Sequence, residues 1–486
     1  MNNAYQRPKF ATNRPKQDQF LIESDDQTLQ TDPVQTYSSI YTVQGSDFHS
    51  GYSSVNVLFR GRKDVMIAIA ALSLLAGISG DPVDSNEVTL WNSILIDFTR
   101  LGSAPPSYMS RNMAVLSIAQ FDALNAISGH YKPYKYAPAA KTPGASERAA
   151  VIGASVAVLK EISNSRRNSY ALYLKKVMNE LGESKSVREG LRIGEESAKA
   201  ILEDRRTDGT YLSEGTNPVS NAIGLYRESV QADVKASTPF WGRVTTFCLM
   251  KGGGLRPQNI DIHSKTYVDD FNEVKDFGGK VSGKRTVDQG DSAKFWAFGG
   301  GTITPPGAWN QIATGVILAK KLNLLETSRT YALLNIALAD AGIACWECKY
   351  TYNFWRPITA INNADDDGIP ETIGDKAWRP LLNTPNFPSY VSGHSTFSSA
   401  GATILTALFG ETTPFTYKGD PHFSVKPRSF KNFWQAAQEA GQSRIYGGIH
   451  FQFDNKAGLA LGKAIAQEVM SMELKPLAQI SPSSNQ

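Results

Sequence analysis

Residues 387–396 contain the residue types of an anion-binding site. Their sequence, Phe-Pro-Ser-Tyr-Val-Ser-Gly-His-Ser-Thr, runs directly into an apolar segment, residues 396–409, that is expected to be helical. The N–H groups of Ser392, Gly393 and His394 would then lie at or near a helix N-terminus, where they lack helical partners and the dipole favours negative charge. Ser392 adds a hydroxyl group, and His394 adds a group that transfers protons. The alternative interpretation is an ordinary capped helix with a surface histidine.

Two cations precede this turn in the chain. Lys349 and Arg356 are seven positions apart, which is about two turns of an α-helix. The spacing therefore predicts that both side chains project from one helix face. Pro357 follows directly and predicts the end of that helix. Taken alone, the pair would equally fit a solvated basic stripe.

Residues 443–451 add a further cation and a second histidine, Arg444 and His450. His450 alone would equally fit a hydrogen-bonded core histidine. Together the three segments supply three fixed positive charges, a helix N-terminus, a hydroxyl group and two histidines. This set suits a tetrahedral or trigonal-bipyramidal oxyanion with charge on three equatorial oxygens. One histidine could bond to the central atom, and the other could transfer a proton to or from an apical oxygen.

Three other motifs do not support a site of their own. Residues 278–285 have the Gly-x4-Gly-Lys spacing of a phosphate loop, but Arg285 stands where Ser or Thr is needed, so we predict a flexible basic loop. Cys345 and Cys348 fall within a predicted helix without a second metal-type pair, and we expect packing residues rather than zinc ligands. Residues 365–368 lack the rest of a calcium loop and predict a turn.

The order Lys-x6-Arg-Pro, Ser-Gly-His and Ser-Arg-x5-His resembles the signature shared by vanadium-dependent haloperoxidases and the type 2 phosphatidic acid phosphatase superfamily, which includes bacterial acid phosphatases. The motif region covers about residues 335–465, and weaker similarity reaches back to residues 90–92 and 105–112. The surrounding sequence is similar to the haloperoxidase branch at Trp346 and at residues 354–357, 387–390 and 450–454.

This resemblance implies that the cofactor is vanadate, covalently held by one histidine, rather than haem or a nucleotide. His450 would be the axial vanadium ligand, and His394 would be the acid–base group near the apical oxygen. Trp346 and Phe387 would line a halide pocket. Vanadium(V) would act as a Lewis acid that polarises peroxide, without redox cycling. The groups implied to neutralise or hold the equatorial oxygens are Lys349, Arg356, Arg444, Ser392 and Gly393.

The leading hypothesis is a vanadate-dependent haloperoxidase. Such an enzyme uses hydrogen peroxide to oxidise a halide ion to a hypohalous-acid equivalent, which halogenates a small organic acceptor. The first alternative is a soluble acid phosphatase of the same superfamily, in which His450 becomes phosphorylated and His394 protonates the leaving group. The second alternative is a catalytically silent, anion-binding helical protein.

Three positions bear on the match to the family. Val391 stands where many relatives have Pro before Ser-Gly-His. Chloroperoxidase-like members carry an Asp that orients the last arginine, whereas here Gly299 takes that place, so the resemblance leaves the orientation of Arg444 open. Phe387 is shared with chloroperoxidase-like relatives, where bromoperoxidases tend to have His.

Composition excludes some classes of function. The 486 residues allow one large domain or two to three ordinary ones. A net charge of +4 without a dense basic run does not support nucleic-acid binding, and three cysteines do not make a disulfide framework. No stretch reaches the roughly 18–20 apolar residues of a spanning helix, so an integral membrane protein, including a membrane lipid phosphatase, is disfavoured. Homo-oligomerisation stays open.

The chain is expected to have four parts. Residues 1–60 are polar and aperiodic and predict a disordered or loosely attached arm. Residues 61–81 contain an apolar run that fits a signal-like segment or a buried helix. Localisation is open, because the first case implies secretion or a periplasmic protein and the second a soluble intracellular one. Residues 82–475 predict a helical haloperoxidase-like domain, and residues 476–486 a flexible tail.

The predicted fold is all-α, with two packed four-helix-type bundles and long loops covering the active site. Residues 205–306 are rich in Gly and aromatic residues and are expected to be those loops, with a few extended pieces. Apolar periodicity predicts helices over residues 88–96, 110–127, 147–162, 166–181, 188–202, 308–323, 328–350, 395–409, 430–446 and 455–472.

Overall fold

The computed structural model of the chain separates into two units, Met1–Pro82 and Val83–Gln486. The described residues are 22–23, 39–43, 55–59, 86–162, 174–175, 177–217, 220–227, 236–249, 255–420 and 424–477. The apolar segment 61–81, most of the predicted arm and residues 478–486 of the predicted tail lie outside them. Their predicted character therefore stays a prediction.

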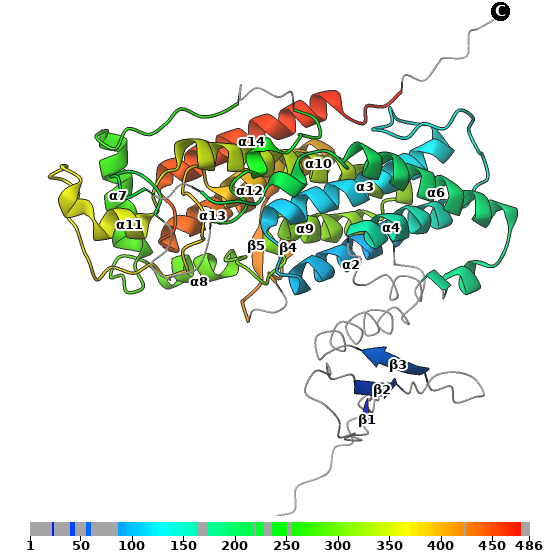
Figure 1. Cartoon of the computed structure of the whole chain (residues 1–486), viewed down its shortest axis with the longest axis horizontal. Helices are drawn as coiled ribbons and strands as arrows, with labels where there is room; N and C mark the ends of the chain where they lie inside the picture. The colour runs from blue at the N-terminus through cyan, green and yellow to red at the C-terminus, as the bar shows by residue number, and fades with distance from the viewer. Residues whose placement is uncertain are drawn as a thin grey trace, which may run out of the picture. The chain divides into compact units, whose positions relative to one another are not determined.

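The first unit contains a small antiparallel sheet (Figure 1). Its strands are β1 (Ile22–Glu23), β2 (Ser39–Val43) and β3 (Val55–Phe59), in the order β1-β2-β3. These strands lie within the segment predicted as a disordered or loosely attached arm, and the prediction did not include them.

The second unit is mostly helical, which confirms the helical class of the fold (Figure 1). Its helices are α2 (Glu87–Leu101), α3 (Pro106–Ser128), α4 (Glu147–Ile162), α6 (Lys185–Asp204), α7 (Lys265–Gly278), α8 (Val287–Phe295), α9 (Thr304–Lys320), α10 (Leu324–Tyr352), α11 (Pro357–Asn362), α12 (Gly393–Phe409), α13 (Phe433–Tyr446) and α14 (Gln452–Met472). Residues 177–181 of the predicted helix 166–181 are also helical. None of the helices in the described part of the chain has both the length and the apolar character needed to cross a membrane.

The prediction of a purely α-helical domain needs correction at one place. Strands β4 (Phe415–Tyr417) and β5 (Arg428–Phe430) form an antiparallel pair. The predicted helix over residues 430–446 therefore begins later, at Phe433, because Asn432 is its N-cap and accepts a hydrogen bond from the Gln435 backbone.

The prediction of long loops over residues 205–306 is wrong for two segments, α7 and α8. Helix α7 starts after Ser264, whose side chain accepts from the backbone of Tyr267. Helix α8 starts with a reciprocal capping box between Thr286 and Gln289. The many glycines around these segments led to the prediction of loops, so the N-termini of both helices were missed.

Three rejected motifs have ordinary structures. The predicted basic loop begins inside α7, and Arg285 is held by the carbonyl oxygens of Phe277, Gly279 and Tyr446 rather than free. The two helical cysteines are buried in α10, which confirms their packing role. Residues 364–368 form a 3-10 turn and a bend, as predicted.

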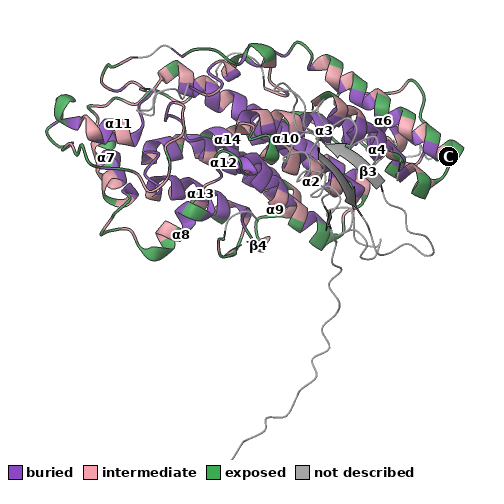
Figure 2. Ribbon diagram, turned by 60° about the horizontal axis from the view of Figure 1, so that its bottom comes forward, coloured by how far each residue is buried: buried purple, intermediate pink, exposed green. Residues whose placement is uncertain are grey.

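Helix α10 connects two groups of helices (Figure 1). Helices α3, α4 and α6 pack against one another, as do α12, α13 and α14, and α10 packs against both α3 and α12. A capping box between Asn323 and Glu326 begins α10, and nearly all its length is buried (Figure 2). Because it is buried on almost every side, its sequence is apolar around the whole circumference rather than on one stripe.

Small residues bring α12 and α14 very close together. A Cβ atom on Gly462 would lie 2.1 Å from the carbonyl oxygen of Thr396, and one on Gly458 would lie 2.7 Å from that of Ser392. Real Cβ atoms do not approach so closely, so only glycine fits at either position. The contact fixes the first turn of α12 against α14.

Candidate active site

The first turn of α12 presents unpaired N–H groups, as its sequence predicts. Ser392 is the N-cap, and its hydroxyl oxygen accepts from the backbone of Ser395. The Ser392 N–H itself donates to the carbonyl oxygen of Asp454 at 3.0 Å. The N–H groups of Gly393 and His394 have no partner inside the helix, because they belong to its first turn. This helix end can therefore receive an anion.

Lys349 lies in the last turn of α10 and is fully buried. Its Nζ donates to three carbonyl oxygens of the segment before α12: Pro388 at 2.9 Å, Ser389 at 2.9 Å and Val391 at 2.6 Å. Burial lowers the pKa of Lys349. The ammonium group thus holds the loop that leads into Ser392, and its charge acts on the site from behind that loop.

Arg356 does not lie on the same helix as Lys349, so the predicted shared helix face is wrong. Helix α10 ends at Tyr352, because Asn353 adopts a left-handed conformation with φ of 48°. Arg356 is instead the N-cap residue of α11. The two cations still converge, since each lies in direct contact with the segment 387–391.

Arg356 is the best-placed free donor in the site. Its Nε donates to the carbonyl oxygen of Phe387 at 2.7 Å, and its Nη1 donates to that of Ile449 at 2.8 Å and to Nε2 of His450 at 3.1 Å. Its Nη2 is buried without a partner among the described residues. Burial lowers the pKa of Arg356 to about 10, which leaves it charged near neutral pH.

The neighbours of His450 assign its tautomer. A guanidinium group only donates, so Nε2 of His450 accepts from Arg356 and carries a lone pair. The proton is therefore on Nδ1, which donates to Oδ2 of Asp454 at 2.7 Å. Ser389 donates its hydroxyl proton to the same carboxylate oxygen, and the N–H of Phe451 reaches it at 3.2 Å.

Asp454 contacts His450 directly, and the sequence interpretation did not include it among the candidate site residues. Burial raises the pKa of Asp454, and the hydrogen bond from Ser389 acts in the opposite direction. The signal was the spacing His-x3-Asp, which places an acid four residues after His450, at the start of a helix. A carboxylate in this position orients the imidazole and increases its basicity.

Several of the residues that the sequence singles out lie close enough to His450 to act on its pKa. Burial first, and then the positive charges of Arg356 and Lys349, hold the pKa of His450 well below its ordinary value. His394 and Arg444 act on it in the same direction. His450 is therefore a neutral imidazole whose Nε2 lone pair accepts the hydrogen bond from Arg356.

Arg444, in α13, is held by backbone oxygens instead of a carboxylate. Its Nη2 donates to the carbonyl oxygen of Ala293 at 2.8 Å, and its Nη1 lies 3.5 Å from that of Ala297. Its Nε donates to the hydroxyl group of Ser443 at 3.0 Å. Burial lowers the pKa of Arg444 to about 9. The end of α8 thus supplies the orientation that Gly299 cannot.

His394 lies beside the same end of α8. Hydrogen bonds to the backbone of Trp296 and Ala297 raise its pKa, but burial and the charge of Arg444 lower it well below the ordinary value. Its Nε2 is buried without a partner among the described residues. His394 is therefore a neutral base with one unoccupied ring nitrogen.

Trp346 and Phe387 form the aromatic wall of the site. Their ring centroids are 5.1 Å apart. The Phe387 ring also lies 5.1 Å from Nζ of Lys349 and 4.9 Å from Cζ of Arg356, within range of cation–π attraction. Nε1 of Trp346 is buried without a hydrogen-bond partner among the described residues.

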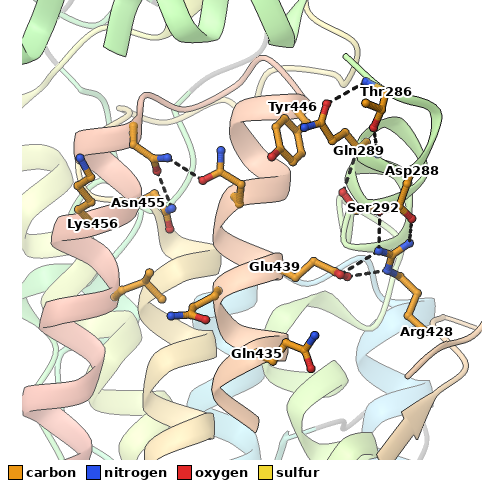
Figure 3. Close-up of a pocket in the computed structure, with 14 residues that line it drawn as sticks. Thr286, Asp288, Gln289, Ser292, Arg428, Gln435, Glu439, Tyr446, Asn455 and Lys456 are labelled. Atoms are coloured by element: carbon orange, nitrogen blue, oxygen red, sulfur yellow. Dashed lines mark hydrogen bonds and ion pairs between the residues drawn. The ribbon is translucent and has the colours of Figure 1, made fainter. Parts of the chain in front are cut away.

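A chain of hydrogen bonds links Ser392 to a surface groove. Ser395 lies 2.9 Å from the Ser392 hydroxyl and donates to Oδ1 of Asn455 at 2.8 Å. Asn455 donates to Gln452 at 2.7 Å, and Gln452 donates to Gln442 at 2.6 Å. The three amides line a polar groove of about 730 Å³ between α8, α13 and α14 (Figure 3).

The predicted residues together fit a bound oxyanion. Three buried cations act on His450, whose ring bonds to the buried carboxylate of Asp454, so positive charge exceeds negative charge around this histidine. Burial makes such an excess costly unless an anion balances it. Among the described residues, Nη2 of Arg356 and Nε2 of His394 have no partner, and two N–H groups of α12 have no partner inside the helix. Vanadate or phosphate would meet each of these needs.

A helical fold with this cationic, histidine-containing cage defines an oxyanion-binding class of protein. Residues 329–478 match the family described as the VCPO second helical-bundle domain. This segment of the chain is therefore a helical-bundle domain of the vanadium haloperoxidase family.

Two curated relatives are similar over part of their length. The chain is 28% identical over 287 residues to the vanadium chloroperoxidase of Curvularia inaequalis, covering 45% of this chain and 46% of that protein. It is 28% identical over 144 residues to the vanadium-dependent bromoperoxidase of Ascophyllum nodosum, covering 26% of this chain and 25% of that one. The matches thus span about half and a quarter of these relatives.

Solved structures share the fold over more of the chain. A bacterial vanadium-dependent iodoperoxidase has a TM-score of 0.71 at 25% identity, covering 82% of this chain and 100% of that one. The apo form of a bacterial vanadium-dependent chloroperoxidase has a TM-score of 0.60 at 15% identity, covering 76% of this chain and 94% of that one. The second likeness concerns the fold alone.

Proposed function

We propose that the protein is a vanadate-dependent haloperoxidase. The observation that carries the proposal is His450, a neutral imidazole whose Nε2 accepts a hydrogen bond from Nη1 of Arg356 while its Nδ1 donates to Asp454. This is the state that a histidine needs in order to bond to the central atom of an oxyanion. The other terminal nitrogen of the Arg356 guanidinium group, Nη2, is buried without a partner among the described residues. Membership of the family supports vanadium as that atom.

The remaining residues would hold the oxygens of vanadate. When bound, vanadate supplies a Lewis acid that polarises hydrogen peroxide. Lys349 contributes its charge, while its N–H groups keep the preceding loop in place. The groups expected to hold the equatorial oxygens directly are Nη2 of Arg356, the guanidinium of Arg444, the hydroxyl of Ser392 and the N–H of Gly393.

His394 would move the proton that the reaction requires. The overall conversion takes hydrogen peroxide, a halide ion and one proton to hypohalous acid and water. Nε2 of His394 has no partner among the described residues and is unprotonated near neutral pH, because burial and Arg444 depress the pKa of His394. It can accept a proton from peroxide as peroxide enters and return it as the products leave.

Trp346 and Phe387 provide a place for the halide ion. The free indole N–H of Trp346 can donate to an anion, and the Phe387 ring excludes water beside two cations. We propose that the halide binds against this wall before it is oxidised, and that a small organic acceptor reacts with the hypohalous-acid equivalent released.

The second candidate is an acid phosphatase that uses the same residues. His450 Nε2 would attack phosphorus to form a phosphohistidine, and His394 would protonate the leaving group. The neutral, carboxylate-oriented His450 favours this candidate as well, because such an imidazole is a nucleophile. A silent anion-binding relative would bind the oxyanion without either reaction.

Reconstitution with orthovanadate tests the proposal. The purified chain, loaded with vanadate, is assayed for halogenation of a cyclic diketone with hydrogen peroxide and chloride, bromide or iodide. We expect turnover that requires vanadate and is lost in His450→Ala, with His394→Ala retaining vanadate binding but losing rate by about 10²–10⁴-fold. Hydrolysis of phosphate esters without halogenation would instead establish the second candidate, and oxyanion binding without either reaction would establish the silent relative.

We further propose that residues 82–475 form one helical domain with two four-helix-type bundles. One bundle would contain α3, α4 and α6, and the other α12, α13 and α14. The packing of α10 against both groups supports this arrangement, since α10 can serve as the fourth helix of each.

A further inference from the structure

We propose that the C-terminal turn of α8 positions Arg444 and His394 together, and that Glu439 of α13 anchors this turn. The effect that this arrangement should have on oxyanion binding rests on the proposed function. No sequence motif marks these residues. The inference comes from two sets of hydrogen bonds, one on each side of α8.

The inner set joins the end of α8 to the site. Arg444 donates to the carbonyl oxygens of Ala293 and Ala297, and His394 is hydrogen-bonded to the backbone of Trp296 and Ala297. The last carbonyls of a helix lack helical partners and form the negative end of its dipole. The N–H of Ala297 bonds to Lys294, which leaves the oxygen of Ala293 available. One backbone turn thus supplies both the acceptors and the partial negative charge.

The outer set holds this turn in place, and Figure 3 shows the part of it formed by Asp288, Arg428 and Glu439. Nε1 of the buried Trp296 donates to Oε1 of Glu439 at 2.9 Å. Glu439 also forms a two-pronged ion pair with Arg428, at 2.6 and 2.9 Å. Arg428 reaches back to Asp288, in the first turn of α8, at 2.8 Å. Helix α8 is therefore tied at both ends to a single carboxylate on α13.

Glu439 and Arg444 lie on the same helix, and both form hydrogen bonds with the C-terminal turn of α8. Because Arg444 has no carboxylate partner among the described residues, the position of that turn determines where its guanidinium group points. Loss of the Glu439 anchor should let Trp296 and the two carbonyl oxygens shift. The expected result is weaker oxyanion binding through Arg444 and slower proton transfer through His394.

The first test compares Glu439→Ala with the intact chain in two measurements. Hydrogen–deuterium exchange should increase in peptides covering residues 293–301 and stay unchanged in α10. Calorimetric titration with orthovanadate should show binding about 10-fold weaker, the lower end of the effect seen when outer partners of a metal site are removed. Glu439→Gln keeps an acceptor for Trp296, so its exchange and its affinity should lie between those of the intact chain and those of Glu439→Ala.

The matched control is Glu203→Ala, which removes an exposed ion pair of α6 with Arg206. It should change oxyanion affinity by no more than about twofold. If Glu439→Ala leaves both exchange and affinity unchanged, or if Glu203→Ala weakens binding equally, the positioning role is overturned. Trp296→Phe removes the indole N–H that bonds to Glu439, together with part of a buried ring, and should shift both readouts in the same direction, even if Glu439→Ala does not fold.

A double-mutant cycle separates positioning from general loosening. If Glu439 acts through Arg444, then Glu439→Ala should weaken orthovanadate binding much less in an Arg444→Ala background than alone. An equal loss in both backgrounds would contradict the inference. If the intact chain binds neither orthovanadate nor orthophosphate, the proposed function fails, while the exchange measurement still decides whether Glu439 anchors α8.

Discussion

His450 lies between a guanidinium group and a carboxylate, and the two neighbours give its ring nitrogens opposite tasks. Arg356 can only donate, so Nε2 must accept, and Asp454 takes the proton on Nδ1. Burial and three nearby cations both disfavour a positive charge on the imidazole, so it stays neutral despite this carboxylate. At this scale the chemistry depends on one tautomer, and Asp454 maintains it.

Replacing Asp454 by Asn tests that dependence. The amide oxygen can take over the contacts with Ser389 and His450, but the negative charge that increases the basicity of the imidazole is lost. We expect orthovanadate affinity to fall by about 10- to 100-fold with the fold retained. Calorimetric titration measures the affinity, and Asp269→Asn, on the exposed face of α7, serves as the control. Unchanged affinity in Asp454→Asn would show that the carboxylate has no such role.

At the scale of elements, the site depends on helix ends that meet at short distances. The start of α12 is pressed against α14 through glycines, and the end of α8 is pressed against α13 through Arg444. Each contact brings a backbone group, rather than a side chain, to the place where a partner needs it. The helices therefore tolerate little change in separation.

Two glycine-to-alanine changes separate close packing from helix propensity. A methyl group on Gly462 would lie 2.1 Å from the carbonyl oxygen of Thr396, so Gly462→Ala should lower the free energy of unfolding by roughly 1–3 kcal/mol. Gly315 lies on the exposed side of α9 with nothing within 4 Å, so Gly315→Ala should raise it by up to about 1 kcal/mol. Urea unfolding measures both. Effects of the same sign would contradict the close approach.

Asp122 gives the connection after α3 a dependence on pH. Its carboxylate accepts from the backbone of Tyr134, Lys135 and Tyr136 at 2.7–2.8 Å. Burial nevertheless raises the pKa of Asp122 to about 6. In the unfolded chain the pKa is near 4, so between these values the folded state binds more protons. The contribution of this group to stability is therefore greatest below about pH 4 and declines as the pH rises to about 6.

The corresponding measurement compares the intact chain with Asp122→Asn in urea at several pH values. The amide does not titrate, so the free energy of unfolding of the intact chain, minus that of Asp122→Asn, should decrease as the pH rises from about 4 to about 6, by at most roughly 3 kcal/mol. It should then stay constant above that range. An increase in this quantity with rising pH would mean that the three hydrogen bonds affect the pKa of Asp122 more strongly than burial does.

At the scale of the whole molecule, all the site residues lie in the unit Val83–Gln486. They come from the C-terminal parts of α10 and α13, the N-cap of α11, the start of α12, and the segments that precede α12 and α14. These segments are far apart in sequence, so the site forms only when the helices of that unit are assembled.

A chain that begins at Val83 should therefore keep the site. We expect its unfolding midpoint and its orthovanadate affinity to match those of the full chain, because the described partners of the site residues all follow that position. Thermal unfolding and calorimetric titration check the two quantities. A clear loss of affinity on truncation would show that the preceding unit contributes to the site.

Sequence predicts the parts of the site that depend on side-chain chemistry. The cations, the two histidines and the turn at Ser392 stand out because these residue types rarely coincide at this spacing. The position of Arg356 is misjudged, because the left-handed Asn353 that ends α10 has no strong sequence signal. The role of α8 is missed because backbone carbonyl oxygens, which every residue possesses, hold Arg444 there. Helix boundaries follow caps more closely than apolar periodicity, as at Asn432 and Thr286.

The three carbonyl oxygens around Lys349 also affect how this residue reacts with chemical labels. Burial lowers its pKa, so the unprotonated amine is more abundant here than on a surface lysine. Its three donors are nevertheless fixed to Pro388, Ser389 and Val391, and no part of the side chain reaches solvent. Amine-reactive esters should label the exposed lysines first, so acylation of Lys349 would report the opening of the segment that leads into the Ser392 turn.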